Sequence, residues 1–430
     1  MRWLTILALG VALTACSNPV TPESGAVDDA AIDVFGPYRG AEADNFAASL
    51  RQFEEDTGIA VNYTGSADFV SDLRQRVESG LDAPDIAVIP QPGLIAEIVD
   101  RDLAVPLDDA TVDAVAEHYG DRAASLTAGL EMFVAPYRVS PKSLVWYRPD
   151  VFEQEGWSVP ETIDELVELV DRIQAGQEGS AAPIAPWCFA MASGTATGWA
   201  ATDWVEDLVA RNSGLDVYDR WAAGALPWDA PAIRDALSAF DALVVRSGRA
   251  AGGLRTILQI DVARAGEPLF ADPPGCAMYK QASFAEAWFP DGTEIGRGVD
   301  VFVLPGADAD SPAPMIIGAD SLVQFSDRDD VDRLMQYLVS PDGGREWARR
   351  GGYLSGRTSI DVETYHTDSD RQLAQWLTDG RELRFDASDG LPPEIGSGLL
   401  WREITRWTAG SIGVDEFVAT IDAAMATPPG

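Results

Sequence analysis

The sequence predicts an α/β protein built on a parallel β-sheet. In the first hundred residues after a polar N-terminal segment, short apolar strands alternate with amphipathic helices three times. One of the strands, residues 86–89 (IAVI), is apolar at every position, as expected for a strand that helices cover on both faces. The chain has 430 residues, which is too long for one small core, so at least two domains are expected.

The first strand is predicted over 32–35, and the first helix over 42–56. This helix carries Phe46, Leu50 and Phe53 at spacings of four and three, which places them on one face. The alternation then continues as strand, helix, strand and helix, over residues 59–63, 68–79, 86–89 and from 94 onward.

Ligands of such sheets bind beyond the carboxyl ends of the parallel strands. In this sequence those ends are residues 36–39 (GPYR), 64–66 (TGS) and 90–92 (PQP). We therefore expect these three loops to lie at one edge of the sheet and to form part of a binding site.

The rest of the chain continues the mixture of strands and helices without an internal repeat. Strands are expected over 133–138, 143–147, 275–279, 299–304 and 315–317. Helices are expected over 162–175, 230–245, 331–339 and 343–349, and the tail over 371–426 is predicted as helical with a break at 389–393.

The charge of the chain is strongly acidic. Asp and Glu number 69 against 31 Lys and Arg, which gives a formal net charge of −38. This balance argues against nucleic acid as a partner and against phosphate-rich ligands held by bulk charge. The simplest interpretation of the excess is a solvated surface.

The N-terminus has the pattern of a secretory signal. A positive start, Met1-Arg2, precedes an apolar run over 3–13 that is too short to cross a bilayer. The run ends in Leu13-Thr14-Ala15-Cys16, which resembles the bacterial lipoprotein box, with cleavage before Cys16 and a diacylglycerol on its sulfur. Residues 1–15 are thus predicted as a signal peptide. Residues 16–31 are predicted as a flexible tether between the lipid anchor at Cys16 and the folded part of the chain.

Two further cysteines remain, Cys188 and Cys276. Outside the cytoplasm they are expected to form a disulfide. A metal site is the weaker alternative because His118 and His366 are the only histidines. A catalytic thiol would need a nearby base, and neither histidine is near in sequence.

The stretch 186–208 (PWCFAMASGTATGWAATDWVEDL) combines small residues with tryptophans and carboxylates. Small residues let a ligand approach the backbone, and aromatic faces beside hydroxyls and carboxylates suit a sugar. A glycine-rich loop that leads into an ordinary core helix is the alternative. Asp203 and Glu206 could supply the carboxylate pair of a glycosidase, but they also fit residues that cap the start of a helix.

Several segments resemble the extracytoplasmic solute-binding proteins of bacterial ABC importers, in the sugar-binding group that includes maltose- and α-glucoside-binding proteins. They are 53–59 (FEEDTGI), 84–93, 142–166 (KSLVWYRPDVFEQEGWSVPETIDEL), 186–208, 275–288 and 351–358. The resemblance runs from about residue 32 to the C-terminus. It implies a two-lobed α/β fold of the periplasmic-binding-protein type, with each lobe a mostly parallel sheet flanked by helices.

The resemblance also implies that hinge segments join the lobes and that sugar binds in the cleft between them. Lobe one is expected to comprise residues 32–138 plus 300–350, and lobe two residues 139–299 plus 351–430. Both Cys188 and Cys276 then fall in lobe two, where a disulfide would cross-link two parts of that lobe without restricting motion at the hinge.

The family's ligand-binding positions carry over onto a set of polar and aromatic residues in this chain. The set is Tyr38, Arg39, Glu42, Gln91, Arg138, Ser193, Thr195, Trp199, Asp203, Gln281, Phe284, Asp320, Tyr353, Arg357 and Trp401. For most of them a purely structural role is the alternative, such as a salt bridge for Arg138 or a place in the core for an isolated aromatic residue.

The function that follows is capture of an oligosaccharide, expected to be an α-glucoside, by a monomeric lipid-anchored binding protein that delivers it to an ABC permease. No cofactor, metal or catalytic residue is expected. The alternatives are a binding protein for another sugar, a sugar acid or a polyol, which the arginines at 39, 138 and 357 leave open, and a secreted glycosidase.

Overall fold

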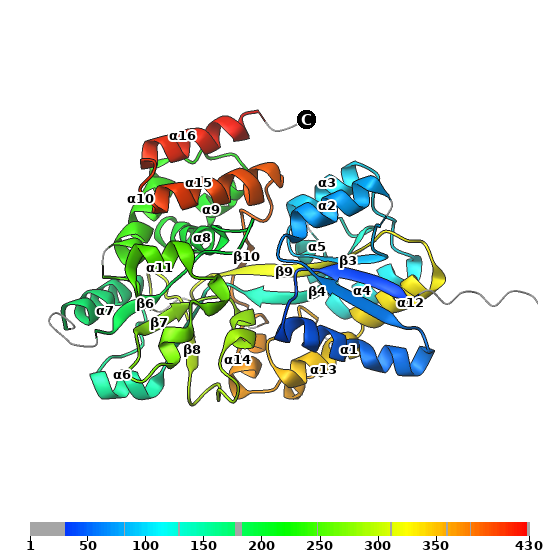
Figure 1. The fold of residues 1–430 in the computed structure, drawn as a ribbon, viewed down its shortest axis with the longest axis horizontal. Helices are drawn as coiled ribbons and strands as arrows, with labels where there is room; N and C mark the ends of the chain where they lie inside the picture. The colour runs from blue at the N-terminus through cyan, green and yellow to red at the C-terminus, as the bar shows by residue number, and fades with distance from the viewer. Residues whose placement is uncertain are drawn as a thin grey trace, which may run out of the picture.

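The computed structural model describes residues 31–80, 82–127, 130–176, 183–246, 248–309, 312–357, 360–378 and 380–427. The predicted signal peptide, the lipidation residue Cys16 and nearly all of the predicted tether lie outside the described residues. The chain forms two lobes that lie side by side, with two long strands running between them (Figure 1). Among the described helices, none has both the length and the apolar character that a membrane span requires.

The first lobe contains the N-terminal strands and helices. Its sheet has the order β10-β9-β3-β1-β2, with β4 also paired to β9. The strands are β1 Ile32–Gly36, β2 Val61–Gly65, β3 Ile86–Ile89, β4 Val134–Pro141, β9 Met315–Gln324 and β10 Leu383–Phe385. Strands β2 and β3 both pair in parallel with β1, as the sequence predicts.

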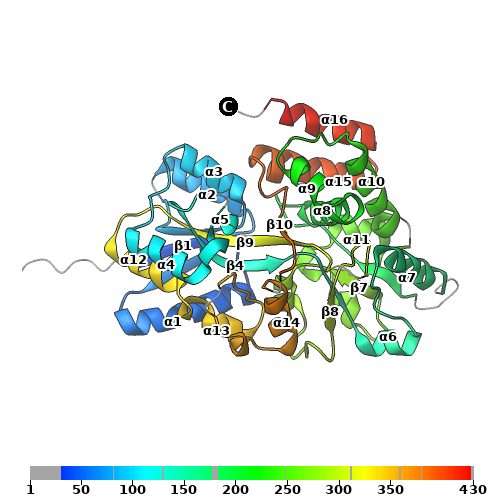
Figure 2. The same cartoon turned by 180° about the vertical axis from the view of Figure 1, so that it is seen from behind.

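Helices pack on both faces of this sheet (Figures 1 and 2). They are α1 Ala41–Thr57, α2 Phe69–Ser79, α3 Pro92–Asp100, α4 Asp109–Tyr119, α5 Ala123–Leu126, α12 Asp329–Val339 and α13 Asp342–Arg350. Helix α1 buries the predicted face of Phe46, Leu50 and Phe53. It ends at Gly58, whose φ of 74° needs the conformational freedom of glycine.

The second lobe has a sheet of order β6-β7-β5-β8. Its strands are β5 Leu144–Tyr147, β6 Ala185–Cys188, β7 Cys276–Lys280 and β8 Asp300–Val303. The surrounding helices are α6 Pro149–Glu155, α7 Ile163–Gly176, α8 Trp199–Ser213, α9 Leu215–Ala222, α10 Pro231–Phe240, α11 Gly253–Gln259, α15 Trp401–Thr408 and α16 Val414–Met425. The disulfide Cys188–Cys276 joins β6 to β7, which confirms the predicted pairing.

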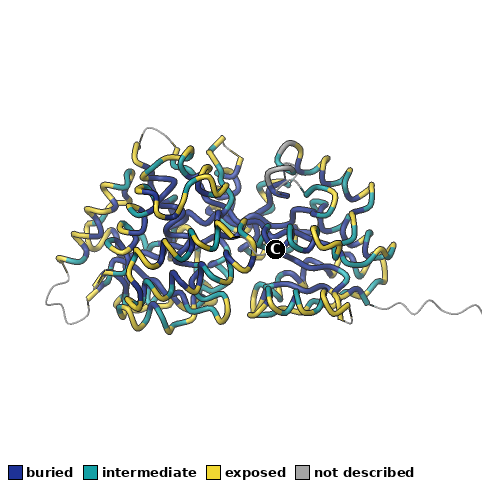
Figure 3. Tube along the Cα trace, turned by 90° about the horizontal axis from the view of Figure 1, so that it is seen from above, coloured by how far each residue is buried: buried dark blue, intermediate teal, exposed yellow. Residues whose placement is uncertain are grey.

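Strands β4 and β9 are the long strands that run between the lobes (Figure 1). They pair antiparallel, and every residue of both is buried. Arg138 of β4 stands opposite Asp320 of β9, just after an irregularity in the register at Pro136. Buried residues are concentrated inside each lobe and where the lobes meet (Figure 3).

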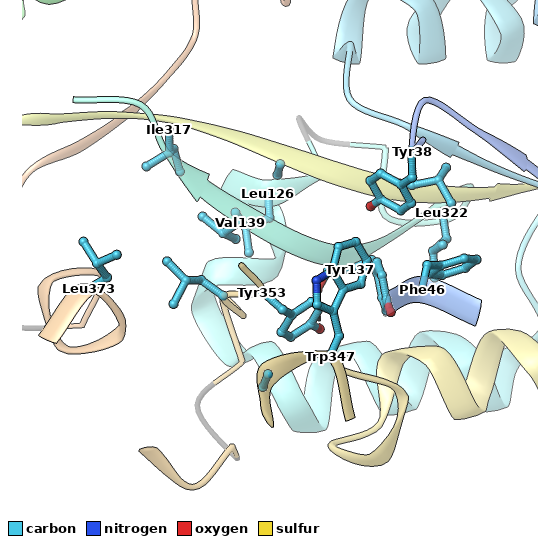
Figure 4. Close-up of a cluster of buried hydrophobic side chains, with 14 of the residues drawn as sticks. Tyr38, Phe46, Leu126, Tyr137, Val139, Ile317, Leu322, Trp347, Tyr353 and Leu373 are labelled. Atoms are coloured by element: carbon cyan, nitrogen blue, oxygen red, sulfur yellow. Dashed lines mark hydrogen bonds between the residues drawn. The ribbon is translucent and has the colours of Figure 1, made fainter. Parts of the chain in front are cut away.

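An aromatic cluster lies beside the long strands β4 and β9. Tyr137, Trp347 and Tyr353 pack together there (Figure 4), with 5.4 Å between the rings of Tyr137 and Tyr353. Helix α14, Asp368–Trp376, lies next to this cluster and contributes Leu373 to the same core.

Three segments differ from the predicted lobes. Residues 383–385 are predicted in lobe two, but β10 pairs with β9 in the first sheet. Residues 300–303 were assigned to lobe one, but β8 pairs with β5 in the second sheet. Tyr353 and Arg357 were assigned to lobe two, but they pack against residues of the first lobe. The α/β class is confirmed, although the second sheet is mixed, because β5 is antiparallel to both of its neighbours.

Three local features also differ from the predicted elements. Asp203 and Glu206 do not lie at a helix start, since α8 already begins at Trp199 after Gly198. The tail contains the strand β10, which is too short to show a periodicity in the sequence. The second strand is shifted by two residues, to Val61–Gly65.

Candidate ligand-binding cleft

A cavity of about 680 Å³ lies between the lobes, and residues of both lobes line it. Its volume falls in the range of small-molecule sites, roughly 300–1,000 Å³. Eleven of the residues singled out in the sequence line it together: Tyr38, Arg39, Glu42, Gln91, Arg138, Ser193, Thr195, Trp199, Phe284, Asp320 and Trp401.

The first wall consists of the loops after β1, β2 and β3. Because these strands are parallel, their carboxyl ends meet at one edge of the sheet and bring Arg39, Ser66 and Gln91 to the cavity. The loops touch closely, since a Cβ on Gly65 would lie 1.9 Å from the carbonyl oxygen of Tyr38. Only glycine fits at this position.

A buried polar network backs this wall. The Arg138 Nε donates to Asp320 at 2.6 Å, and its Nη1 donates to Glu42 at 2.9 Å. The Tyr38 hydroxyl donates to the same Asp320 oxygen at 2.8 Å. Burial raises the pKa of Glu42, and Arg138 opposes that rise by favouring the carboxylate. The network therefore fixes the position of the groups that face the cavity.

The floor of the cavity contains a second charged cluster, which the sequence did not reveal. Lys142 Nζ contacts Asp386 at 2.6 Å, Asp389 at 3.1 Å and Asp203 at 3.4 Å. Burial alone would raise the pKa of Asp386, but the ammonium of Lys142 holds it at about 2. Burial raises the pKa of Asp389 to about 7 and that of Asp203 to about 8.

The second wall is aromatic. The rings of Trp199 and Phe284 lie 6.0 Å apart, and those of Phe284 and Trp288 lie 5.2 Å apart. All three are partly exposed and line the cavity. Trp401 also lines the cavity but is only 4% exposed, so most of its ring is covered by protein. The wall offers apolar faces opposite the polar groups of the first lobe.

Two contacts cross the mouth of the cavity. The Thr195 hydroxyl donates to Asp68 at 2.8 Å, which links the loop before α8 to the start of α2. Arg74 of α2 forms an ion pair with Glu97 and another with Glu394, which lies in a π-helical turn over Glu394–Leu400. With these contacts made, the lobes are in a closed arrangement.

Four of the residues singled out in the sequence do not line the cavity. Asp203 lies behind Lys142, and the Gln281 side chain accepts a hydrogen bond from the Ala282 N–H. Tyr353 lies in the aromatic cluster (Figure 4) and donates to the carbonyl of Tyr137.

Arg357 is held by main-chain carbonyls of the first lobe, including that of Val339 at 2.9 Å. Arginine at a family motif suggested a ligand contact, but carbonyls at the end of α12 satisfy the charge. Conversely, the resemblance covers Lys142 within segment 142–166 but implies no contact for it with a ligand. The sequence around Asp389 predicts only a break between helices.

The carboxylate pair that a glycosidase would need is not found at Asp203 and Glu206. Glu206 is 1% exposed, and it accepts hydrogen bonds from the main-chain N–H groups of Ala387 and Ser388. Neither residue lines the cavity. Within the described part of the chain, no group of three or more His, Cys, Asp or Glu side chains is arranged to hold a metal ion.

Sequence comparison finds matches over most of the chain. The model of the bacterial extracellular solute-binding proteins matches residues 39–256. The alpha-glucosides-binding periplasmic protein AglE of Rhizobium meliloti is 31% identical over 394 residues, which cover 89% of this chain and 84% of AglE. The osmoprotective compounds-binding protein GgtB of Synechocystis is 32% identical over 412 residues, 95% of each chain.

Solved structures share the fold at low sequence identity. A chitin oligosaccharide binding protein has a TM-score of 0.73 at 15% identity and covers 91% of this chain and 98% of its own. Maltose-bound MalE3 of T. maritima has a TM-score of 0.69 at 18% identity, over 92% and 98% of the two chains. The chain belongs to the bacterial extracellular solute-binding protein family.

Proposed function

We propose that this chain is the sugar-binding protein of an ABC importer and that it captures an α-glucoside in the cleft between its lobes. The observation that carries the proposal is the composition of the cavity, in which aromatic faces of one lobe stand opposite hydrogen-bonding groups of the other. Sugars have apolar ring faces and polar edges, so they suit such a cleft. The similarity to AglE supports the choice of an α-glucoside.

The ligand contacts in this proposal are the eleven residues that line the cavity. Trp199 and Phe284 stack on the sugar, and Arg39, Glu42, Gln91, Arg138 and Asp320 bind its hydroxyls. Sugar binding stabilises the closed arrangement only to the extent that it binds that state better than the open one. The proposed role is binding without covalent chemistry.

The chain acts in this proposal as a monomer anchored through Cys16 to the outer face of the cell membrane, where it delivers sugar to the permease. The support is the N-terminal signal pattern, together with the periplasmic and extracellular-binding names of relatives. Labelling of cells with a radioactive fatty acid tests the anchor. The wild-type protein should carry the label and Cys16→Ser should not, and a labelled Cys16→Ser variant would refute lipidation at Cys16.

The binding proposal is tested on the protein without residues 1–16. Thermal melting is followed with maltose, trehalose, sucrose and 2-O-α-glucosylglycerol, and calorimetry then gives Kd. At a sugar concentration of 100 Kd, stability should rise by about 2.7 kcal/mol. The sugar should be recovered intact, and cleavage would refute a binding role.

The cavity is tested with a matched pair of tryptophan variants. Trp199→Ala should weaken binding by at least tenfold, whereas Trp376→Ala, on α14 outside the cavity, should leave it unchanged. Equal effects of the two variants would refute the assignment of the cleft. Absence of a shift with all four sugars would refute the α-glucoside assignment.

The similarity to GgtB supports a second candidate ligand, an osmoprotective compound. A preference for a small osmolyte without a glucosyl ring over the α-glucosides would favour this candidate.

A further inference from the structure

The turn Asp386–Asp389 is held rigidly by buried carboxylates. Asp386 accepts hydrogen bonds from the Ser388 hydroxyl at 2.8 Å and from the Asp389 N–H at 2.9 Å. Glu206 accepts from the N–H groups of Ala387 at 2.7 Å and of Ser388 at 3.1 Å. Three successive N–H groups are thus bound, which fixes the direction of the Asp389 side chain.

Lys142 has no donor left for a ligand. An ammonium has three N–H donors, and Asp203, Asp386 and Asp389 are its three carboxylate partners. Lys142 is also only 8% exposed. Its role at the cavity floor is therefore to hold Asp389 rather than to bind a ligand itself.

Asp389 has one oxygen left. Its Oδ2 accepts from Lys142, whereas its Oδ1 accepts no hydrogen bond from any described residue. Asp389 lines the cavity. Asp389 is 7% exposed, and its free Oδ1 is accessible from the cavity, where a hydroxyl of the ligand can donate to it in place of water.

The main chain of the same residue contacts helix α3 of the first lobe. The carbonyl of Asp389 accepts a hydrogen bond from Gly93 N–H at 3.0 Å, at the start of α3 in the first lobe. No side chain fits there, because a Cβ on Gly93 would lie 1.9 Å from the carbonyl oxygen of Leu391. A ligand that binds Asp389 therefore contacts a segment whose main chain is hydrogen-bonded to helix α3 of the first lobe.

Resting on the proposed function, we propose that Asp389 is a ligand contact whose free carboxylate oxygen accepts a hydrogen bond from a sugar hydroxyl, and that Lys142 positions it. The free oxygen of Asp389 is an acceptor, so it binds a donor of the ligand and disfavours an anionic group at this end of the cleft. The group selected is a neutral hydroxyl.

The test compares Asp389→Asn with wild type by calorimetry on maltose, trehalose, sucrose and 2-O-α-glucosylglycerol. For the sugar that wild type binds best, Kd should rise at least tenfold, as for the loss of a hydrogen bond to a charged group. The melting temperature without sugar should stay equal or rise, because an amide avoids the burial of a charge. A purely structural role would instead lower the melting temperature and spare the affinity of the folded protein.

Asp327→Asn, at an exposed position outside the cavity, is the matched control and should change neither quantity. Asp389→Ala is the second variant, and it should fold because the turn uses the main-chain N–H of this residue. If both Asp389 variants bind within twofold of wild type, the inference is overturned while the proposed function stands. If wild type binds none of the sugars, the proposed function fails and the inference falls with it.

Discussion

Thr195 and Asp68 lie on opposite lobes and are joined by a hydrogen bond of 2.8 Å across the mouth of the cavity. Both residues are exposed, and the bond can exist only while the lobes are closed. It therefore contributes to the stability of the closed arrangement and not to the stability of either lobe.

Thr195→Val should weaken sugar binding about fivefold, because the lost hydrogen bond is worth about 1 kcal/mol of the closed state. Calorimetry measures the affinity, and small-angle scattering measures how far the protein closes at saturating sugar. Thr420→Val is the control, since that hydroxyl bonds the carbonyl of Glu416 within α16. An unchanged Kd in Thr195→Val would show that the bond does not favour closure.

Arg138→Met should lower the free energy of unfolding by about 3–5 kcal/mol, because it leaves the buried carboxylates of Asp320 and Glu42 without their partner. Urea unfolding followed by tryptophan fluorescence gives this value. Arg264→Met, which breaks only a surface pair with Glu267, should leave the unfolding midpoint unchanged. A small loss in Arg138→Met would mean that the two carboxyls become protonated at little cost.

The sequence could predict the first wall of the cleft. The periodic helices α1 and α2 and the apolar strand β3 identify a parallel sheet, and the ends of parallel strands must meet at one edge. Arg39 and Gln91 could therefore be placed without a structure.

The floor of the cleft could not be predicted in this way. Lys142 and Asp386 are 244 residues apart in the chain, and no local pattern of either segment reveals their contact. Arg357 shows the opposite error: its residue type suggested a ligand contact, but main-chain carbonyls bind its guanidinium inside the core. In both cases the partners of the charged side chain come from segments that are distant in the sequence, so a local pattern does not identify them.

Wild-type stability should fall between pH 5.5 and pH 8.5. The folded protein holds a proton on Asp203, with a pKa of about 8, that the unfolded chain releases near 3.8, the ordinary pKa of an aspartate. This contribution is fully present below the unfolded pKa and is lost as pH rises through the folded pKa. Asp389 acts in the same direction, with a pKa of about 7.

Asp203→Asn should reduce the fall in melting temperature between these two pH values, whereas Asp327→Asn should keep it. Both pH 5.5 and pH 8.5 lie above the ordinary pKa of surface carboxyls, so the charge of a surface carboxyl such as Asp327 is the same at the two pH values. An identical fall in both variants would show that Asp203 is already ionised at pH 5.5.

Replacement of Cys188 and Cys276 together by alanine should lower the free energy of unfolding by about 4 kcal/mol, because the disulfide closes a loop with a sequence separation of 88 residues. The sugar affinity should stay within twofold of wild type, since both cysteines lie in strands of the second sheet and neither lines the cavity. Denaturant unfolding and calorimetry on the same preparation measure the two quantities. A tenfold loss of affinity in the folded variant would mean that the disulfide also shapes the aromatic wall, which begins eleven residues after Cys188 at Trp199.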